Sequence, residues 1–239
     1  MMKNKVIKFS ALLMITLSMI VVNSCQQCIE GEGEVITETV NVESFAKLSA
    51  DIDATVVLMK GEPAVTIEAQ PNIRAAISVI VKSNKLTVKT TSCFKPNTPV
   101  KITIYSRIFD EIDLKGNVNL TSVNLITAKE LTIHSKGAST LKLDVFVNDI
   151  DMKLEDDSQL TISGNCQNAD LTMKNDAAFE GAGFNSFKMD VELAGSGRAT
   201  VNAFKNLKVR LNGSGEILYS GDPQLDAKID GTGRITKVN

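Results

Sequence analysis

A short segment recurs along the second half of the chain at nearly constant spacing. "LNGSGEIL", which begins at Leu211, has one sibling 18 residues earlier, "LAGSGRAT" at Leu193, and another 18 residues later, "IDGTGRIT" at Ile229. More divergent copies in the same phase begin at Leu114, Ile133, Leu154 and Met173, at intervals of 18 to 21 residues. Seven copies from about residue 112 onward restrict the chain to a fold made of stacked repeats.

The residues ahead of each copy alternate between apolar and charged. Three examples are "LKVRL" (207–211), "MDVEL" (189–193) and "IDMKL" (150–154). This period of two is typical of a β-strand with one buried face. One strand–turn–strand unit cannot bury its own apolar face, whereas stacked copies can, with parallel strands about 4.8 Å apart. The sequence therefore predicts an all-β parallel solenoid, about 29 Å long over its six steps.

The motif "LNGSG" (211–215) also permits two other interpretations. Asn-Gly between apolar residues favours a β-hairpin, and Gly-Ser-Gly ahead of a helix can hold a phosphate. The period argues against the hairpin, and strand-like residues follow the glycines without the Lys-Ser/Thr of a phosphate loop. We therefore expect corners, where the conformational freedom and small size of glycine let the chain turn. The glycines with this structural role are Gly195, Gly197, Gly213, Gly215, Gly231 and Gly233.

Stacking the copies in this phase predicts two columns of like residues. The second glycine of each corner should stack with Gly137, with the small residues Ser158 and Ala177, and with Val118 as an exception. Seven positions after the start of each copy, threonines should form a ladder of β-branched residues. The members of that ladder are Thr121, Thr140, Thr161, Thr200 and Thr236.

The first half of the chain contains strand-like segments without the repeat. They cover residues 35–42, 54–60, 64–69, 77–82, 85–90 and 100–105, with Ser83–Asn84 as a hairpin turn and 93–99 as a loop. A solenoid needs a cap that protects its first strands from water and from edge pairing. We therefore expect a single head domain over 35–239, with the cap and first coils at 35–106 and regular coils at 107–239.

The first 24 residues have the pattern of a signal peptide. Three lysines (Lys3, Lys5 and Lys8) precede an apolar run at residues 9–22, which is too short for a membrane span of about 20 residues. "VVNSC" then resembles a bacterial lipobox, so residues 1–24 would be removed and Cys25 would carry lipid. Residues 25–34 would link that anchor to the head domain. The alternative is an ordinary secretory signal with an unmodified Cys25.

The other cysteines are Cys28, Cys93 and Cys166. Cys25 and Cys28 have the CxxC spacing of a redox or metal pair, but lipidation of Cys25 would remove that pair. A disulfide between Cys28 and Cys93 suits an oxidising compartment, although the sequence does not establish that the two are close. Cys166 is expected to be a small buried hydrophobic residue.

Charge and composition argue against nucleic acid as a partner. The chain has 26 basic and 28 acidic residues, 5% aromatic residues and no tryptophan. It shows no basic stripe and no aromatic platform for stacking bases.

Few residues suggest catalysis or metal binding. His134 is the single histidine and no GxSxG motif accompanies it, so we expect an exposed surface residue. Asp156, Asp157 and Asp176 would lie on neighbouring corners and form a weak candidate for Ca²⁺. The sequence favours a simpler interpretation, in which Asp and Asn serve the turn, and no cofactor is expected.

One further charged column is predicted from the stacking. Arg198, Glu216 and Arg234 would lie on consecutive coils. Such a row could bind a carboxylate, but an exposed ladder of ion pairs is the more common outcome.

Several segments resemble one known family. They are "VESFAKLSADIDATVVLMKGEPAVTIEA" (42–69), "NKLTVKT", "VKITIYS" and the closing "YSGDPQLDAKIDGTGRI" (219–235). Over about residues 35–239 the chain is similar to the putative auto-transporter adhesin, head GIN domain family, although the copies "EDDSQ" and "KNDAA" depart from the GSG pattern. The resemblance implies a right-handed parallel β-helix and a secreted or lipid-anchored location. It implies no catalytic motif.

Two functional hypotheses remain. The first is a non-enzymatic lipoprotein of the bacterial cell envelope, anchored to a membrane by lipid, whose rigid surface binds a glycan or a protein or serves a structural role. The second is a glycan-active lyase or hydrolase, supported by fold analogy and by the aspartates alone. We expect the first, with no enzymatic activity. The membrane face and the oligomeric state stay open.

Overall fold

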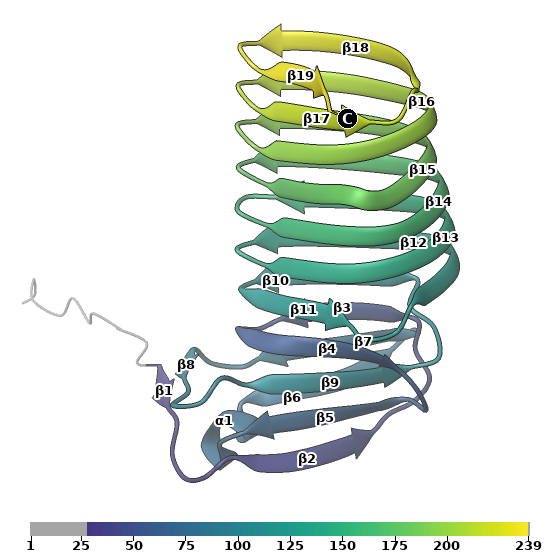
Figure 1. The fold of residues 1–239 in the computed structure, drawn as a ribbon. Helices are drawn as coiled ribbons and strands as arrows, with labels where there is room; N and C mark the ends of the chain where they lie inside the picture. Colours follow the sequence, from purple (N-terminus) through teal and green to yellow (C-terminus); the bar gives the residue numbers. More distant parts are fainter. Residues whose placement is uncertain (1–27, 239) are drawn as a thin grey trace, which may run out of the picture.

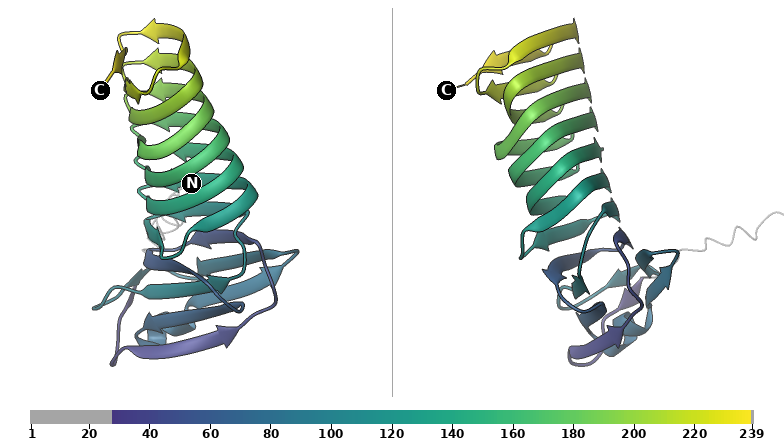
Figure 2. Two further views of the ribbon diagram at one scale, coloured as in Figure 1. Left: turned by 45° about the vertical axis from the view of Figure 1, so that its right-hand side comes forward. Right: turned by 90° about the vertical axis from the view of Figure 1, so that its right-hand side faces the viewer.

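A computed structural model describes residues 28–238 of the chain. The predicted signal peptide and the lipidation site at Cys25 lie outside these residues. No helix within the described part is long and apolar enough to cross a membrane. Figure 1 shows a stack of parallel β-strands on a wider base, and the two views of Figure 2 show the same stack from other sides.

The stack is built from ten strands, and each full turn of the chain around the stack is called a coil. Each strand pairs in parallel with strands of the coil before it or the coil after it. These strands are β10 (Glu111–Gly116), β11 (Val118–Ser122), β12 (Ile126–Gly137), β13 (Thr140–Glu155), β14 (Gln159–Asn175), β15 (Ala178–Gly195), β16 (Arg198–Gly213), β17 (Glu216–Ser220), β18 (Gln224–Gly231) and β19 (Arg234–Lys237). The predicted parallel β-solenoid is confirmed. The predicted right-handedness of the coil stays a prediction.

Each coil has one sharp corner and one wide bend, which lie on opposite sides of the stack (Figure 1). Strands β13 to β16 are 16 to 18 residues long because each runs from one corner, around the bend, to the next corner. Along β13 the inward residues Leu141, Leu143, Val145 and Val147 are at most 4% exposed, and the residues between them face solvent. The apolar core therefore runs up the centre of the stack.

The corners share one backbone conformation. The first corner residue has a positive φ in all seven coils; it is the last residue of the preceding strand in six of them and the residue directly after the strand at Asp156. These residues are Gly116, Gly137, Asp156, Asn175, Gly195, Gly213 and Gly231. Asn212 and Gly213 thus turn a corner between parallel strands and do not form a hairpin.

The predicted phase is wrong for one copy. The copy predicted to begin at Ile133 begins two residues later, because Leu114 pairs with Ser135 and not with Ile133. Gly137 consequently stacks on Gly116, in the first corner column. The partner of Val118 in the second column is Ser139, whose hydroxyl hydrogen-bonds to Gly116 O and to the Val118 N–H.

The expected threonine column is confirmed for four of its five members, Thr121, Thr161, Thr200 and Thr236, but these lie on alternate coils and do not stack directly on one another. In register, Thr121 pairs with Lys142, Thr161 with Glu180, and Thr200 with Leu218 on the following coil. Thr140 lies two residues outside this column, since it pairs with Gln159. Threonines therefore alternate with other residue types instead of stacking on one another.

The base of the stack is formed by the first half of the chain. Its elements are β1 (Ile29–Glu30), β2 (Ile36–Asn41), β3 (Lys47–Asp51), β4 (Ala54–Lys60), β5 (Ala64–Ala69), α1 (Pro71–Ala75), β6 (Ile77–Lys82), β7 (Lys85–Thr90), β8 (Phe94–Lys95) and β9 (Lys101–Ser106). The six predicted strands and the Ser83–Asn84 hairpin turn are all present. Sequence reasoning missed β3, α1 and the two short strands β1 and β8.

Pairing changes from parallel to antiparallel within this cap. Strands β3 and β4 continue the stack below β10 and β11, and β7 and β9 lie in parallel below them. Strand β6 then pairs antiparallel with β7, and β5 and β2 continue antiparallel from β9. Because the outermost strands run antiparallel, the solenoid does not simply end on a free parallel coil at this end.

A disulfide closes the cap. Cys28 and Cys93 are bonded, with their Cα atoms 4.6 Å apart and a sequence separation of 65. Directly after the two cysteines, β1 and β8 pair in parallel, with Ile29 opposite Phe94. The structure thus settles the pairing that the sequence left open.

Candidate binding surface

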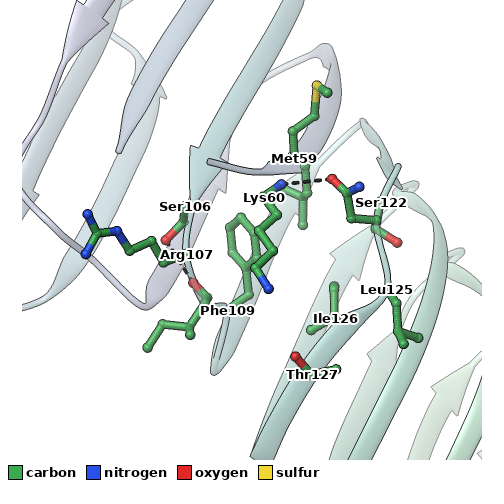
Figure 3. Close-up of a pocket in the computed structure, with 12 residues that line it drawn as sticks. Met59, Lys60, Ser106, Arg107, Phe109, Ser122, Leu125, Ile126 and Thr127 are labelled. Carbon is green, nitrogen blue, oxygen red and sulfur yellow. Dashed lines mark hydrogen bonds between the residues drawn. The ribbon is translucent and has the colours of Figure 1, made fainter. Parts of the chain in front are cut away.

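A small crevice lies where the cap meets the first coils (Figure 3). It has a volume of about 20 Å³, enough for about one water molecule. Several of its polar groups have partners: the Lys60 N–H donates to Asn124 Oδ1 at 3.0 Å, and the Ser106 hydroxyl lies 2.8 Å and 2.9 Å from the backbone oxygens of Phe45 and Ile108 and can donate to either. This crevice is a packing junction and is too small for a substrate.

The flat face of the stack before each corner carries rows of charged side chains. One row contains Asp151, Asp170, Asp190 and Lys208 on successive coils. Burial, followed by the charges of Asp190, Asp151 and Asp149, raises the pKa of Asp170. Lys208 Nζ lies 3.6 Å from Asp190 Oδ2 and partly offsets this repulsion.

This charged face has the wrong shape for glycoside hydrolysis. Asp170 and Asp190 stand side by side on one surface, over a shallow depression of about 210 Å³ that Lys208 and Arg210 also line. The two carboxylates of a glycosidase instead flank the bond that is cleaved, with room for the sugar or for water between them. The face can attract ligands electrostatically, but it offers no acid and base on opposite sides of a substrate.

The corner aspartates take part in hydrogen bonds between coils. Asn175 Nδ2 donates to Asp156 Oδ1 at 2.8 Å, and the Ser196 hydroxyl hydrogen-bonds to Asp176. Asp157 belongs to the same corner as Asp156, one coil away from Asp176. Across residues 28–238 no three His, Cys, Asp or Glu side chains gather in a group that could hold a metal ion.

The other charged residues singled out in the sequence occupy the positions expected of them. His134 is exposed on β12, in register between Asp113 and Lys153. Glu216 bridges Arg198 at 3.6 Å and Arg234 at 2.7 Å, which confirms the ion-pair ladder. The hydrogen bond from Arg234 lowers the pKa of the Glu216 carboxyl.

The wide bend of the stack carries an aromatic and amide surface that sequence reasoning missed. Phe146, Phe187 and Phe204 are 58%, 37% and 57% exposed. Asn165, Asn185 and Asn202 stack above Phe146 on the next three coils. These six residues are called the bend surface.

Hydrogen bonds between coils order the amides of the bend surface. Asn185 Nδ2 donates to Asn165 Oδ1 at 3.1 Å, and Asn202 Nδ2 donates to Asn185 Oδ1 at 2.9 Å. Lys205 Nζ lies 5.2 Å from the centre of the Phe187 ring. The bend surface is therefore a fixed arrangement of rings and carboxamides. Strand alternation places Phe146 on the outside, between the inward-facing Val145 and Val147. This alternation was the sequence signal that could have revealed the bend surface.

Cys166 lies beneath the bend surface as the buried free thiol that the sequence predicted. Burial raises its pKa to about 12. Since the thiolate is the reactive form, its population at pH 8 should be about 1,000-fold lower than for a thiol of pKa 9. We expect the native protein to resist iodoacetamide at pH 8 and the urea-unfolded, non-reduced protein to take up one equivalent at this residue, as measured by peptide mass spectrometry. Rapid labelling of the native protein would contradict the buried placement.

Comparison with known proteins places this fold in one group. The family model of the putative auto-transporter adhesin, head GIN domain, matches residues 44–223. A putative adhesin from Bacteroides fragilis is 24% identical, with a TM-score of 0.83 over 88% of this chain and 100% of its own. A putative adhesin from Parabacteroides distasonis is 19% identical, with a TM-score of 0.71 over 89% of this chain and 100% of its own.

A third solved structure, a putative lipid binding protein from Parabacteroides distasonis, is 17% identical, with a TM-score of 0.69 over 89% of this chain and 100% of its own. No curated protein matches the chain. The solved structures support the fold, and the family match covers about three quarters of the sequence. The chain therefore belongs to the putative auto-transporter adhesin, head GIN domain family.

Proposed function

We propose that this protein is a non-enzymatic binding module of the bacterial cell envelope, anchored through lipidated Cys25, and that its bend surface binds an uncharged glycan. The exposure of Phe146, Phe187 and Phe204 on one side of a rigid stack carries this proposal. Exposed large apolar side chains are normal when scattered, but a group of aromatic rings on one surface is typical of a binding site.

The chemistry of the bend surface suits a sugar chain. Aromatic rings offer flat apolar faces against which the C–H faces of sugar rings can pack. Each asparagine carboxamide supplies both donors and acceptors for hydroxyl groups. From β13 to β16 the surface extends over three coil steps, about 14 Å. Because the strands of the stack hold these side chains, little conformational entropy would be lost on binding.

Binding fits the geometry better than cleavage does. The glycan-active alternative needs two carboxylates across a cleft, whereas Asp170 and Asp190 lie next to each other on the flat face, away from the bend surface. The disulfide between Cys28 and Cys93 supports an extracytoplasmic location, since such bonds persist in oxidising compartments. The solved relatives described as adhesins support a surface role.

The test is a glycan array probed with the chain lacking residues 1–25, followed by titration calorimetry. We expect binding to at least one uncharged glycan, and a dissociation constant at least about tenfold higher after Phe187→Ala/Phe204→Ala, a loss of about 1.4 kcal/mol. The matched control is Ile80→Ala, which removes an exposed apolar side chain from the cap and should leave binding unchanged.

Three outcomes would contradict the proposal. They are the absence of any glycan ligand, binding that the phenylalanine replacements do not change, and binding of the same surface to phosphatidylcholine vesicles instead of glycans. Reproducible breakdown of a bound glycan would restore the enzymatic alternative.

A further inference from the structure

The two ends of the solenoid are finished differently. At the cap end the outermost strands run antiparallel to their neighbours and helix α1 follows β5. At the opposite end the stack finishes on β18 (Figure 1). Strand β18 pairs with β16, and all eight of its residues are exposed. Within residues 28–238 no second strand pairs with its other edge.

The uncovered strand β18 carries the same inward apolar side chains as the coils that are covered on both sides. Leu225 and Ile229 are 39% and 44% exposed, although the residues below them in the same columns, Leu207 and Leu211, are at most 1% exposed. A free strand edge beside an uncovered apolar row is a template for further strand pairing. Natural proteins normally block such an edge.

We propose that the occupant of this edge is the β18 edge of a second copy of this chain, paired antiparallel about Ala227. A two-fold axis perpendicular to the strands produces this arrangement, and such closed dimers are the commonest homo-oligomers. The edge is then covered in both copies at once. Strand β19 at the same end pairs only with β17 within residues 28–238 and keeps its own free edge. The two-fold contact through β18 is itself closed, so it joins only two copies.

The register about Ala227 is self-complementary. Leu225 lies opposite Ile229 of the second copy, and Asp226 lies opposite Lys228 of the second copy, each twice because of the symmetry. Ala227 lies opposite its own counterpart. Oppositely charged pairs across antiparallel strands are stabilising, and like charges directly opposite are destabilising.

The neighbouring two-fold registers do not have this property. Centring on Lys228 would place lysine against lysine and Asp226 against Asp230, while centring on Asp226 would place aspartate against aspartate. Centring on Ile229 would also pair Lys228 with Asp230, but it would place Leu225 opposite Gly233, beyond the end of β18. Charge and apolar pairing together therefore select the register about Ala227.

The charges around Lys228 also favour the approach of another carboxylate. On its own strand its Nζ lies 3.0 Å from Asp230 Oδ2, but in register it stacks directly above the cation Arg210. Asp226 of the second copy would add a negative charge beside these two cations. Asp226 stacks on Lys208, which already approaches Asp190.

The dimer has a consequence for the proposed anchored protein. Strand β1 belongs to the cap, at the far end of the stack from β18 (Figure 1), and Cys28 directly precedes β1 in the sequence. In an end-to-end dimer the two caps therefore point in opposite directions. With Cys25 as the anchor, which rests on the proposed function, the dimer would join two opposing membrane surfaces.

Charge reversal tests the register directly. In sedimentation velocity from 1 µM to 1 mM we expect the chain lacking residues 1–25 to form a dimer. Asp226→Lys and Lys228→Asp should each raise the dimer dissociation constant at least tenfold, because like charges then face each other. An equal mixture of the two variants should dimerise again, since every pair across the edge is then opposite in charge. Glu62→Lys, an exposed reversal in the cap, is the matched control and should dimerise as wild type does.

The proposal is overturned by a wild-type monomer at 1 mM, by a dimer insensitive to both reversals, or by failure of the mixture to recover. The anchored arrangement has its own test with phosphatidylcholine vesicles carrying the lipidated chain. Wild-type vesicles should cluster, and vesicles with Asp226→Lys should cluster only with those carrying Lys228→Asp. A charge-sensitive solution dimer without vesicle clustering would overturn the joining of two membranes and leave the dimer standing.

Discussion

Replacing Gly213 with alanine should destabilise the protein by about 2–4 kcal/mol. The φ of Gly213 is +128°, a conformation that residues with a side chain rarely adopt. A Cβ added there would lie 2.4 Å from the backbone oxygen of Gly195 on the preceding coil. The contact is with backbone, so no side chain can rotate away. Either the corner opens or the two coils separate.

The effect should be visible in thermal unfolding followed by circular dichroism. For a chain of this size we expect the melting temperature to fall by roughly 5–15 °C. The matched control is Gly183→Ala, where the new Cβ would meet only Ser163, at ordinary contact distances of 3.5 Å from its Cβ and 3.9 Å from its Cα, and no positive φ is required. That variant should stay within about 0.5 kcal/mol of wild type. Equal melting temperatures for the two variants would contradict the assigned role of the corner.

The first corner position is occupied by a residue other than glycine in two coils. Asp156 and Asn175 have φ near 60°, in the left-handed region that Asp and Asn tolerate better than other residues. Gly195, Gly213 and Gly231 have φ from 128° to 140°, well beyond that region. The departures from GSG in the middle copies therefore reflect a different local conformation and not a loss of the corner.

The period predicted the stack because corners and strand alternation are local requirements. The spacing alone gave the wrong phase for one copy, because extra residues at the bend alter the interval between copies without altering the corner. Residues around Val123 and Leu125 connect β11 to β12 and lie partly in solvent, where extra length is tolerated. Matching Gly116 with Gly137 would have revealed the slip, since both end a strand with a positive φ.

The bend surface was missed because a composition average says nothing about position. Aromatic residues are only 5% of the chain, yet three phenylalanines face outward along the bend. In the cap, the strands could be predicted from their own alternation, but their order in the sheet could not. Helix α1 has only five residues, too few to show a helical period. The Cys28–Cys93 pair likewise depends on the path of the chain between two residues that are separated by 65 positions.

Removing that disulfide should be the second large perturbation. Replacing both Cys28 and Cys93 with serine frees a loop of 65 residues in the unfolded chain. The chain-entropy model assigns about 4 kcal/mol to closing a loop of this length. Cys166→Ala serves as the control for loss of a cysteine alone, because this residue has no disulfide partner among residues 28–238.

The loss should concentrate in the cap. In a solenoid each coil contacts only its neighbours, so stability is held locally and the ends can open first. Hydrogen exchange should therefore become faster in β6 and β7 of the double variant and change little in β14 and β15. Dithiothreitol should lower the stability of wild type to that of the double variant and leave the double variant unaffected. Uniform loss of protection along the whole stack would show instead that the cap and the coils unfold as one unit.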